Sequence, residues 1–401
     1  MKKTSSSYPV NLPKTGFPMK GDLPVREPHM LRLWEAVDVY GKLEKKNRGK
    51  ASFILHDGPP YANGHIHIGH VVNKVLKDFV VKFRMMTGRF APYVPGWDCH
   101  GLPIEHQLMK EKHINKHKVD RLAFRREAAR FAERFVSIQR EEFKRLGCMG
   151  DWDHPYLTMT PAYEKNIVRT FHALLKNGFI YRKKKPVLWC ASCETALADA
   201  EVEYHEHTSP SIYVAFALNK NDRPCLKPFW DHYTELFMVI WTTTPWTLPA
   251  NVAIALKPKR MYRLVKKQSN ESARYLVEDS LWQTHKENFS THLGLVEDSQ
   301  DTSLLRAEDL VGCSAQHPFV QDRESMIIAA DFVDTETGTG AVHIAPGHGE
   351  EDYLAGMANN LPIISPVDDA GRFTGEVPQF SGTMVFASND GIIELLRKRN
   401  A

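Results

Sequence analysis

The stretch ASFILHDGPPYANGHIHIGH, residues 51–70, sets the expected fold of the first part of the chain. Its first five residues are mostly apolar and predict a buried strand that ends in the turn cluster His-Asp-Gly-Pro-Pro. Apolar residues between 71 and 83 then recur on one broad face, which predicts a helix. Tyr93 and Val94 predict a second short strand, so the sequence indicates a β–α–β unit.

The turn between this strand and helix lies where ligands bind in parallel sheets, outside the carboxyl end of a strand. A helix N-terminus presents free N–H groups and a positive potential, which favour an anion such as phosphate. His67 and His70 are three residues apart, so they share one face of the first helical turn. A single histidine at this place is more often a cap or surface residue, but two can donate hydrogen bonds to phosphate oxygens.

The rest of the chain divides into a helical part and a β-rich part. Long helices are expected near 121–146 and 161–176, and after residue 205 short apolar segments separated by Gly, Pro and Asn predict strands. The strand candidates are 212–216, 236–240, 252–256, 262–265, 326–328 and 341–344. The expected domains are an N-terminal arm and helix (1–50), an α/β domain (51–205), a mostly β domain (206–390) and the start of a further helix (391–401), which looks truncated.

Length and composition agree with a globular chain of two or three domains. The chain has 401 residues, with 52 Lys and Arg against 48 Asp and Glu, and 42% of its residues are apolar. No apolar run is long enough for a membrane span, and the basic N-terminus leads into no signal-peptide core. Six scattered cysteines predict no disulfide framework, so we expect a protein of the reducing cytoplasm.

The segment Trp189-Cys190-Ala191-Ser192-Cys193 has the spacing of half a zinc site. A C-x-x-C turn presents two thiolates to one metal, and tetrahedral closure needs two more ligands. His205 and His207 follow at a short distance and are one way to complete the site. The alternative is a metal-free turn with two thiols.

Two further strings stand out in the β-rich part. Residues 241–251, WTTTPWTLPAN, follow the strongest apolar strand and place several hydroxyls at a strand exit. Residues 338–353, GTGAVHIAPGHGEEDY, combine glycines with histidines and acids. These strings predict the walls of a polar pocket, although a threonine run is also typical of an ordinary exposed turn. The basic run 182–185, RKKK, is either a solvated surface or a contact for a nucleic-acid backbone.

These motifs resemble those of the class I aminoacyl-tRNA synthetases. His67-Ile68-Gly69-His70 matches the family's His-Ile-Gly-His element, and the preceding Pro-Pro-Tyr-Ala-Asn-Gly is similar to the isoleucine-specific members. Residues 96–105, GWDCHGLPIE, are also similar to that branch, whereas leucine- and valine-specific members diverge here. The resemblance covers essentially the whole chain.

The resemblance implies a Rossmann-like nucleotide-binding half with an inserted, mostly β editing domain. The implied activity is ATP-dependent activation of isoleucine and its transfer to tRNA(Ile), with Mg²⁺ accompanying ATP. His67 and His70 would stabilise the ATP phosphates, and Asp98 would pair with the α-ammonium of isoleucine. The residues implied to line the adenylate site are Gly58, Pro59, Asn63 and Gly69.

The editing domain has an energetic reason in this family. Valine differs from isoleucine by one methylene, which a pocket discriminates by only about 1–3 kcal/mol, a range established on this same pair of amino acids. A second site that hydrolyses valyl-tRNA(Ile) supplies the remaining selectivity. The resemblance implies that a positioned water attacks the ester, that His343 excludes isoleucyl groups and that Asp352 binds the α-ammonium. The other implied editing residues are Thr242, Thr243, Thr244 and Asn251.

One family motif is missing from these residues. The sequence contains no Lys-Met-Ser-Lys-Ser loop, which in the family closes on ATP from the second half of the nucleotide fold. In many isoleucine-type members a second cysteine pair, which would complete a zinc site with Cys190 and Cys193, follows the editing domain. We therefore expect an N-terminal part of a monomeric, cytoplasmic ligase that is inactive in synthesis by itself. The alternative hypothesis is a stand-alone module that binds or edits tRNA.

Overall fold

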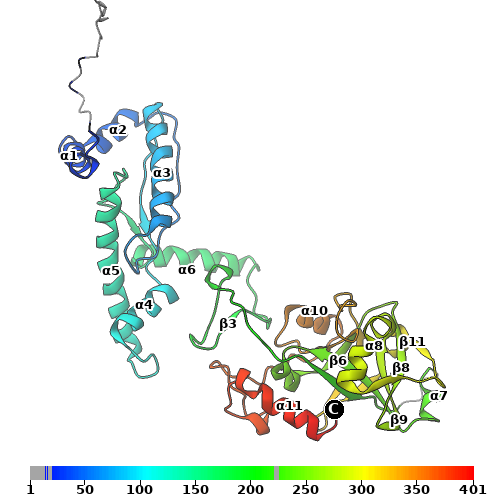
Figure 1. The fold of residues 1–401 in the computed structure, drawn as a ribbon. Helices are drawn as coiled ribbons and strands as arrows, with labels where there is room; N and C mark the ends of the chain where they lie inside the picture. Colours follow the sequence, from blue (N-terminus) through cyan, green and yellow to red (C-terminus); the bar gives the residue numbers. More distant parts are fainter. Residues whose placement is uncertain (1–13, 15, 17–19, 221–224) are drawn as a thin grey trace, which may run out of the picture. The chain divides into compact units, whose positions relative to one another are not determined.

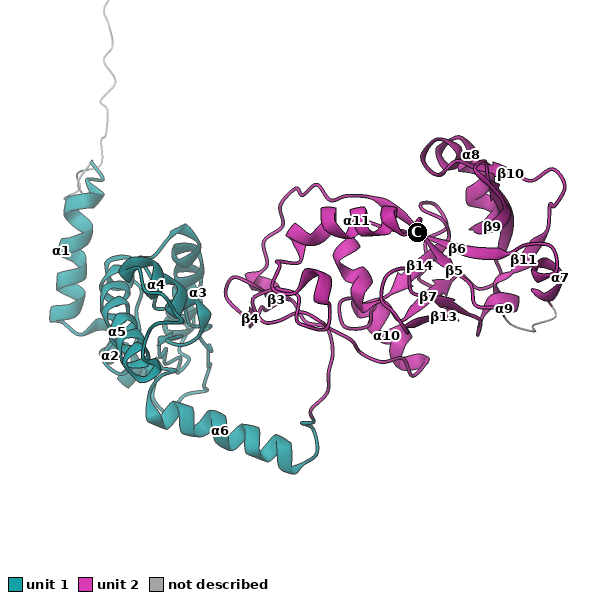
Figure 2. Cartoon of the chain, turned by 90° about the horizontal axis from the view of Figure 1, so that it is seen from below, with its two compact units in different colours: residues 1–181 teal, residues 182–401 magenta. Residues whose placement is uncertain are grey.

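The computed structural model describes residues 14, 16, 20–220 and 225–401, which form two compact units, 1–181 and 182–401 (Figure 2). Most of the expected N-terminal arm lies outside the described residues. The boundary between the units precedes the Cys190/Cys193 turn, so this turn belongs to the second unit, whereas the sequence suggested a boundary near residue 205.

The first unit consists mainly of helices (Figure 1). They are α1 (Leu23–Ala36), α2 (Val39–Asn47), α3 (Ile68–Met86), α4 (Leu102–Lys112), α5 (Arg121–Arg145) and α6 (Pro161–Lys176). Two short strands, β1 (Gly96–Trp97) and β2 (Tyr156–Leu157), pair in parallel. Helices α3, α5 and α6 confirm the three helices expected from apolar periodicity and from their terminal residues.

The buried strand expected at 51–55 is wrong. Only an isolated parallel bridge between Ser52 and Phe90 forms there, and the side chain of Ile54 is 68% exposed. In the described part of the chain no strand lies alongside 53–55, so the hydrogen-bond ladder stops after this bridge. The second strand expected at Tyr93 and Val94 is wrong as well, because neither residue lies in a strand. A parallel relation around α3 is nevertheless kept, because a second parallel bridge joins Tyr61 to Asp98.

Aromatic residues from the central segments and from α5 form the main core of the first unit. Trp97 and Phe143 are fully buried, and Phe131, Phe135 and Trp152 pack with them. Burial of such large side chains fixes α5 against the segment that carries β1. Helix α3 contributes to a smaller core with Val81 and Met85.

The second unit contains two larger β-sheets and one two-stranded hairpin sheet (Figure 1). One larger sheet has the order β10-β8-β9-β6-β5, with β11 also paired to β8, and the other has the order β12-β13-β7-β14. The strands of the first sheet are β5 (Ile212–Ala217), β6 (Glu235–Thr242), β8 (Met261–Lys267), β9 (Asn270–Glu278), β10 (Leu295–Glu297) and β11 (Leu304–Arg306). The strands of the second are β7 (Ala253–Leu256), β12 (Ser314–Gln316), β13 (Glu324–Ala329) and β14 (Ala341–Ile344).

All six expected strands of the β-rich part are confirmed, by β5, β6, β7, β8, β13 and β14. Strands β9, β10, β11 and β12 were not predicted, and neither were the unit's elements outside the two larger sheets, except for the last helix. The elements outside these sheets are the hairpin strands β3 (Trp189–Cys190) and β4 (Thr195–Ala196), the α-helices α7 (Lys227–Trp230), α8 (Asp279–Leu293), α9 (Ala307–Leu310), α10 (Glu350–Ala358) and α11 (Asn389–Lys398), and the 3₁₀ turns η1 (Asp199–Glu201), η2 (Pro245–Ala250), η3 (Pro378–Phe380) and η4 (Phe386–Ser388).

The largest core of the second unit draws residues from both sheets and from α11. Phe216 and Ile240 of one sheet and Ile254 of the other are fully buried in it, and Ile392 of α11 joins them. The side chain of Asn389 accepts a hydrogen bond from the N–H of Trp246, at a distance of 3.1 Å. Helix α11 therefore holds η2, the turn that follows β6, in place.

Candidate functional site

The first candidate site is the turn before α3. The N–H of Gly69 donates to Nδ1 of His67 at 3.1 Å, and the N–H of His67 donates to Nδ1 of His70 at 3.2 Å. The two ring centroids are 3.9 Å apart. Because Nδ1 accepts in both rings, a neutral imidazole here carries its proton on Nε2. Burial, with the charges of His67 and Lys74, lowers the pKa of His70, so its ring is a neutral Nε2–H donor at pH 7.

A buried ionic network supports this turn. Asp57 is 1% exposed and accepts hydrogen bonds from Lys74 and, at 2.6 Å, from Lys77. Burial alone would raise the pKa of Asp57, but the two ammonium groups outweigh it and lower the pKa. Lys74 also donates to the hydroxyl of Tyr93 at 3.1 Å. Asp57 was not predicted as a site residue, although it lies beside Gly58 and its two partners are one helical turn apart.

Helix α5 holds the loop that leads into α3. The amide nitrogen of Gln139 donates to the carbonyl of Tyr61 at 3.0 Å and to that of Gly64 at 2.7 Å. Its amide oxygen accepts from Nε1 of Trp97 at 2.9 Å. Glu142, one turn later, accepts from the N–H of Ile66 at 3.0 Å. The loop is thus fixed by a buried amide that no sequence pattern singles out.

The other expected adenylate-site residues lie around the same turn. The backbone of Asp98 bonds to Pro60 and Ala62, which puts this half-buried residue beside the loop, and its side chain accepts from Thr158 at 3.3 Å. Asn63 donates to the carbonyl of Pro103 at 3.3 Å. Gly58 and Gly69 are exposed, and Pro59 is partly buried. An adjacent cleft of about 290 Å³ is lined by Ile54, Leu55, His56, Asp57, Pro92, Val94, Tyr156 and Tyr163.

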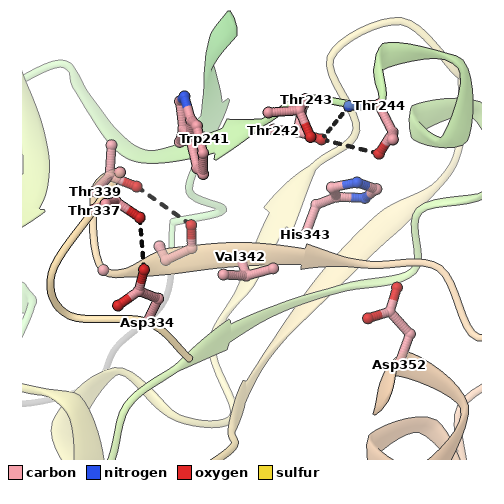
Figure 3. A pocket seen from close by; sticks show the side chains of 13 residues that line it. Trp241, Thr242, Thr243, Thr244, Asp334, Thr337, Thr339, Val342, His343 and Asp352 are labelled. Atoms are coloured by element: carbon pink, nitrogen blue, oxygen red, sulfur yellow. Dashed lines mark hydrogen bonds between the residues drawn. The ribbon is translucent and has the colours of Figure 1, made fainter. Parts of the chain in front are cut away.

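The second candidate site is a cleft of about 250 Å³ in the β-rich unit (Figure 3). Its walls are the end of β6, the loop and strand at 337–343, and two carboxylates, Asp334 and Asp352. The two polar strings of the sequence, about a hundred residues apart, therefore meet in one cleft. The predicted residues Thr242, Thr243, Thr244, His343 and Asp352 all line it.

Asn251, the remaining predicted residue of this cleft, does not line it. Its side chain is fully buried, donates to the carbonyl of Ala253 at 2.8 Å and accepts from the hydroxyl of Ser325 at 2.5 Å. An asparagine at the end of a tight 3₁₀ turn satisfies local backbone groups in this way. Asp334 and Thr337, in contrast, line the cleft and were not predicted. Their place just before the Gly-Thr-Gly string was the available signal.

A chain of hydroxyls connects the threonine wall to His343. Oγ1 of Thr244 lies 3.3 Å from Oγ1 of Thr242 and 3.3 Å from Oγ1 of Thr247. Thr247, in η2, also lies 3.1 Å from Nε2 of His343. The tight turn at Pro245 brings these groups together, and Thr247 is another member of the site that was not predicted.

The cleft holds two carboxylates with opposite pKa shifts. Burial raises the pKa of Asp352, and a 2.9 Å hydrogen bond from the N–H of Ala345 opposes this only in part. A hydrogen bond from the hydroxyl of Thr337, 2.6 Å long, lowers the pKa of Asp334. A carboxylate with few donors of its own, such as Asp352, favours a cationic partner.

Three histidines of this unit predict a dependence of its stability on pH. Burial lowers the pKa of His317, His343 and His348 to about 4 each. Between pH 6.5 and 4 the unfolded chain binds more protons than the folded one, so the stabilisation is complete above pH 6.5 and is lost as pH falls towards 4. We expect the free energy of unfolding of this unit, measured with urea, to fall by roughly 1–3 kcal/mol per histidine as the pH decreases over that interval. The variant His317→Gln should reduce the dependence, and an unchanged pH slope in that variant would refute this assignment.

Cys190 and Cys193, the predicted half of a zinc site, lie in the turn between β3 and β4. The N–H of Cys193 donates to Sγ of Cys190 at 3.3 Å, and Nε1 of Trp189 donates to the carbonyl of Asp369 at 2.9 Å. Across 20–220 and 225–401 no three His, Cys, Asp or Glu side chains gather closely enough to hold a metal ion. His205 and His207 therefore do not complete this site, and the residues present do not fit a closed zinc centre.

No helix in the described ranges combines the length and apolar character needed to cross a membrane.

Residues 29–359 match the family described as tRNA synthetases class I (I, L, M and V). Similar curated proteins are isoleucine--tRNA ligases from Moorella thermoacetica (50% identical), Desulforamulus reducens (48%) and Thermotoga maritima (49%). Each match covers 97–98% of this chain but only 40–41% of the relative.

Solved structures with similarity to the chain include a LeuRS-tRNA-LeuAMS ternary complex from Agrobacterium radiobacter K84. It is 19% identical with a TM-score of 0.40, and the match covers 95% of this chain and 47% of that one. A structure described as GlLeuRS-CP1 is 13% identical with a TM-score of 0.36, and the match covers 47% of this chain and 96% of that one.

Proposed function

This chain belongs to the class I tRNA synthetase family of the isoleucine, leucine, methionine and valine enzymes, and on that premise we propose that it is part of an isoleucine–tRNA ligase. The support is 48–50% identity to such ligases over nearly all of the chain, which spans about 40% of their length. The substrates of the whole enzyme would be isoleucine, ATP with Mg²⁺, and tRNA(Ile).

The proposed role of the first unit is to bind ATP and isoleucine. The Nε2–H groups of His67 and His70, at the N-terminus of α3, suit the phosphate oxygens of ATP. Asp98 suits the α-ammonium of isoleucine, because an ionised carboxylate forms a charge-assisted hydrogen bond with it. Gly58, Pro59, Asn63 and Gly69 would line the adenylate, and Asp57 with its lysines would keep the turn in place.

The proposed role of the β-rich unit is hydrolysis of valyl-tRNA(Ile). The observation that carries this proposal is that the threonine string, His343 and Asp352 line one cleft. Asp352 would bind the α-ammonium, and the threonine hydroxyls would donate to the ester and the terminal ribose. A water molecule would add to the ester carbonyl, the bond to the ribose oxygen would break, and the water's proton would pass to that oxygen. A stand-alone tRNA-binding or trans-editing module, the alternative, would use the same cleft.

His343 is the residue that we propose limits the size of the amino acid. His343 is 6% exposed and forms part of the cleft wall. The variant His343→Ala should remove this wall, so isoleucyl-tRNA(Ile) becomes a substrate while valyl-tRNA(Ile) is still cleaved. Deacylation time courses on both charged tRNAs measure this, with His292→Ala, a change on the exposed surface of α8, as the control. If His343→Ala cleaves valyl-tRNA(Ile) and leaves isoleucyl-tRNA(Ile) intact, the size-exclusion role is wrong.

A further inference from the structure

The imidazole of His343 has one partnered and one unpartnered nitrogen. Nε2 lies 3.1 Å from Oγ1 of Thr247, whereas Nδ1 is buried and has no hydrogen-bond partner among the described residues. Buried polar groups in folded proteins nearly always have partners, so an unpartnered one requires an explanation. Figure 3 shows this ring below the side chains of Thr242 and Thr244, in the wall of the cleft.

The contacts of Thr247 decide which nitrogen of His343 carries the proton. The hydroxyl of Thr247 donates to the carbonyl of Thr244 at 2.8 Å, and a carbonyl can only accept. Its single proton is thus used, and its oxygen accepts from Nε2–H of His343. The opposite tautomer would bury an N–H at Nδ1 without an acceptor, and orphaned buried N–H groups are rarer than orphaned acceptors. Burial also lowers the pKa of His343 to about 4, so the ring is neutral at pH 7.

We propose that Thr247 is a positioning residue that holds His343 as the Nε2–H tautomer, so that Nδ1 is a hydrogen-bond acceptor for a neutral O–H group bound in the cleft. This inference rests on the proposed hydrolysis of aminoacyl-tRNA and extends it to a residue outside the cleft lining. The O–H group is either the attacking water or the free hydroxyl of the terminal ribose, since both are neutral donors. His343 then has an orienting role in addition to its bulk.

The tautomer itself can be measured without any activity. In the full 401-residue chain labelled with ¹⁵N-histidine, long-range ¹H–¹⁵N spectra at pH 7 report which ring nitrogen is protonated. The His343 signals are those that disappear in His343→Gln. We expect a protonated Nε2 and an unprotonated Nδ1. Thr247→Val, which keeps the shape and removes the hydroxyl, should mix the tautomers, and Thr247→Ser should restore the wild-type spectrum.

Deacylation of valyl-tRNA(Ile) tests the consequence. Thr247→Val should slow it by roughly tenfold, the effect of one misplaced hydrogen bond, and Thr247→Ser should retain most of the rate. A substrate that lacks the free hydroxyl of the terminal ribose separates the two donors. If that hydroxyl is the donor, the ratio of the wild-type deacylation rate to the Thr247→Val rate falls towards one with this substrate. The ratio persists if water is the donor.

A protonated Nδ1 in the wild-type spectrum would overturn the proposal. So would a Thr247→Val spectrum identical to that of the wild type, provided that the circular dichroism of both chains agrees. If the wild-type chain does not deacylate valyl-tRNA(Ile) at all, the proposed function fails, while the spectra still decide the tautomer. The two failures are therefore distinguishable.

Discussion

The variant Asp352→Asn should lose most of the deacylation of valyl-tRNA(Ile), by roughly ten- to a hundredfold. An ionised carboxylate that binds an α-ammonium contributes about 1.5–3 kcal/mol, and the neutral amide keeps the size but not the charge. Asp352 lies in the cleft, and among the described residues its side chain accepts one backbone hydrogen bond, from the N–H of Ala345 at 2.9 Å, so its charge is available to a ligand.

The pH dependence of deacylation checks the same assignment. Burial raises the pKa of Asp352, so the rate should fall as pH decreases through this raised value, because protonation removes the charge. In Asp352→Asn this fall of the rate with decreasing pH should be absent. The matched control is Glu351→Gln, which changes the exposed carboxylate next in sequence and should leave the rate unchanged. Equal rates for Asp352→Asn and wild type would exclude the ammonium-binding role.

The variant Asp57→Ala should destabilise the first unit by about 3–5 kcal/mol. Removing one partner of a buried ion pair leaves an uncompensated charge, here the ammonium of Lys74, whose side chain is 3% exposed. Lys77 and the N–H of Gly96 also lose an acceptor. We therefore expect the turn before α3 to lose its anchor together with part of the core.

Hydrogen exchange monitored by mass spectrometry resolves the effect of Asp57→Ala in each unit. Amides of 51–98 should exchange faster, while those of the β-rich unit should be unaffected, because Asp57 bonds to residues of the first unit. Glu35→Ala, which removes an exposed ion pair with Lys144, is the control and should have little effect. A stability of Asp57→Ala close to that of this control would show that the buried network is not needed.

The sequence predicted those elements whose own residues carry the signal. Helices α3, α5 and α6 have clear apolar periodicity, and β6 is apolar almost throughout, so local pattern and burial agree. The strand at 51–55 failed because an apolar run predicts pairing but cannot supply the neighbouring strand. Helix α8 was missed because its residues mix charged, aromatic and small side chains without a continuous apolar face.

The same distinction holds for the candidate sites. Thr242, His343 and Asp352 belong to unusual strings and were predicted as site residues through the family resemblance, and in the structure they line one cleft. Thr247 and Gln139 could not be selected, because their roles depend on contacts far along the chain. Thr247 contacts His343, which is 96 positions away, and Gln139 contacts Tyr61 and Gly64, which are 78 and 75 positions away. Side-chain roles set by tertiary contacts have no local pattern.

The measurement that tests the central proposal most directly is deacylation by the unmodified 401-residue chain. Valyl-tRNA(Ile) and isoleucyl-tRNA(Ile) are incubated separately with excess protein, and the spontaneous loss in buffer is subtracted. The account predicts rapid hydrolysis of valyl-tRNA(Ile) and retention of isoleucyl-tRNA(Ile). If a folded chain, as judged by circular dichroism, hydrolyses both at the same rate or neither above the buffer rate, the proposed editing function of the β-rich unit is contradicted.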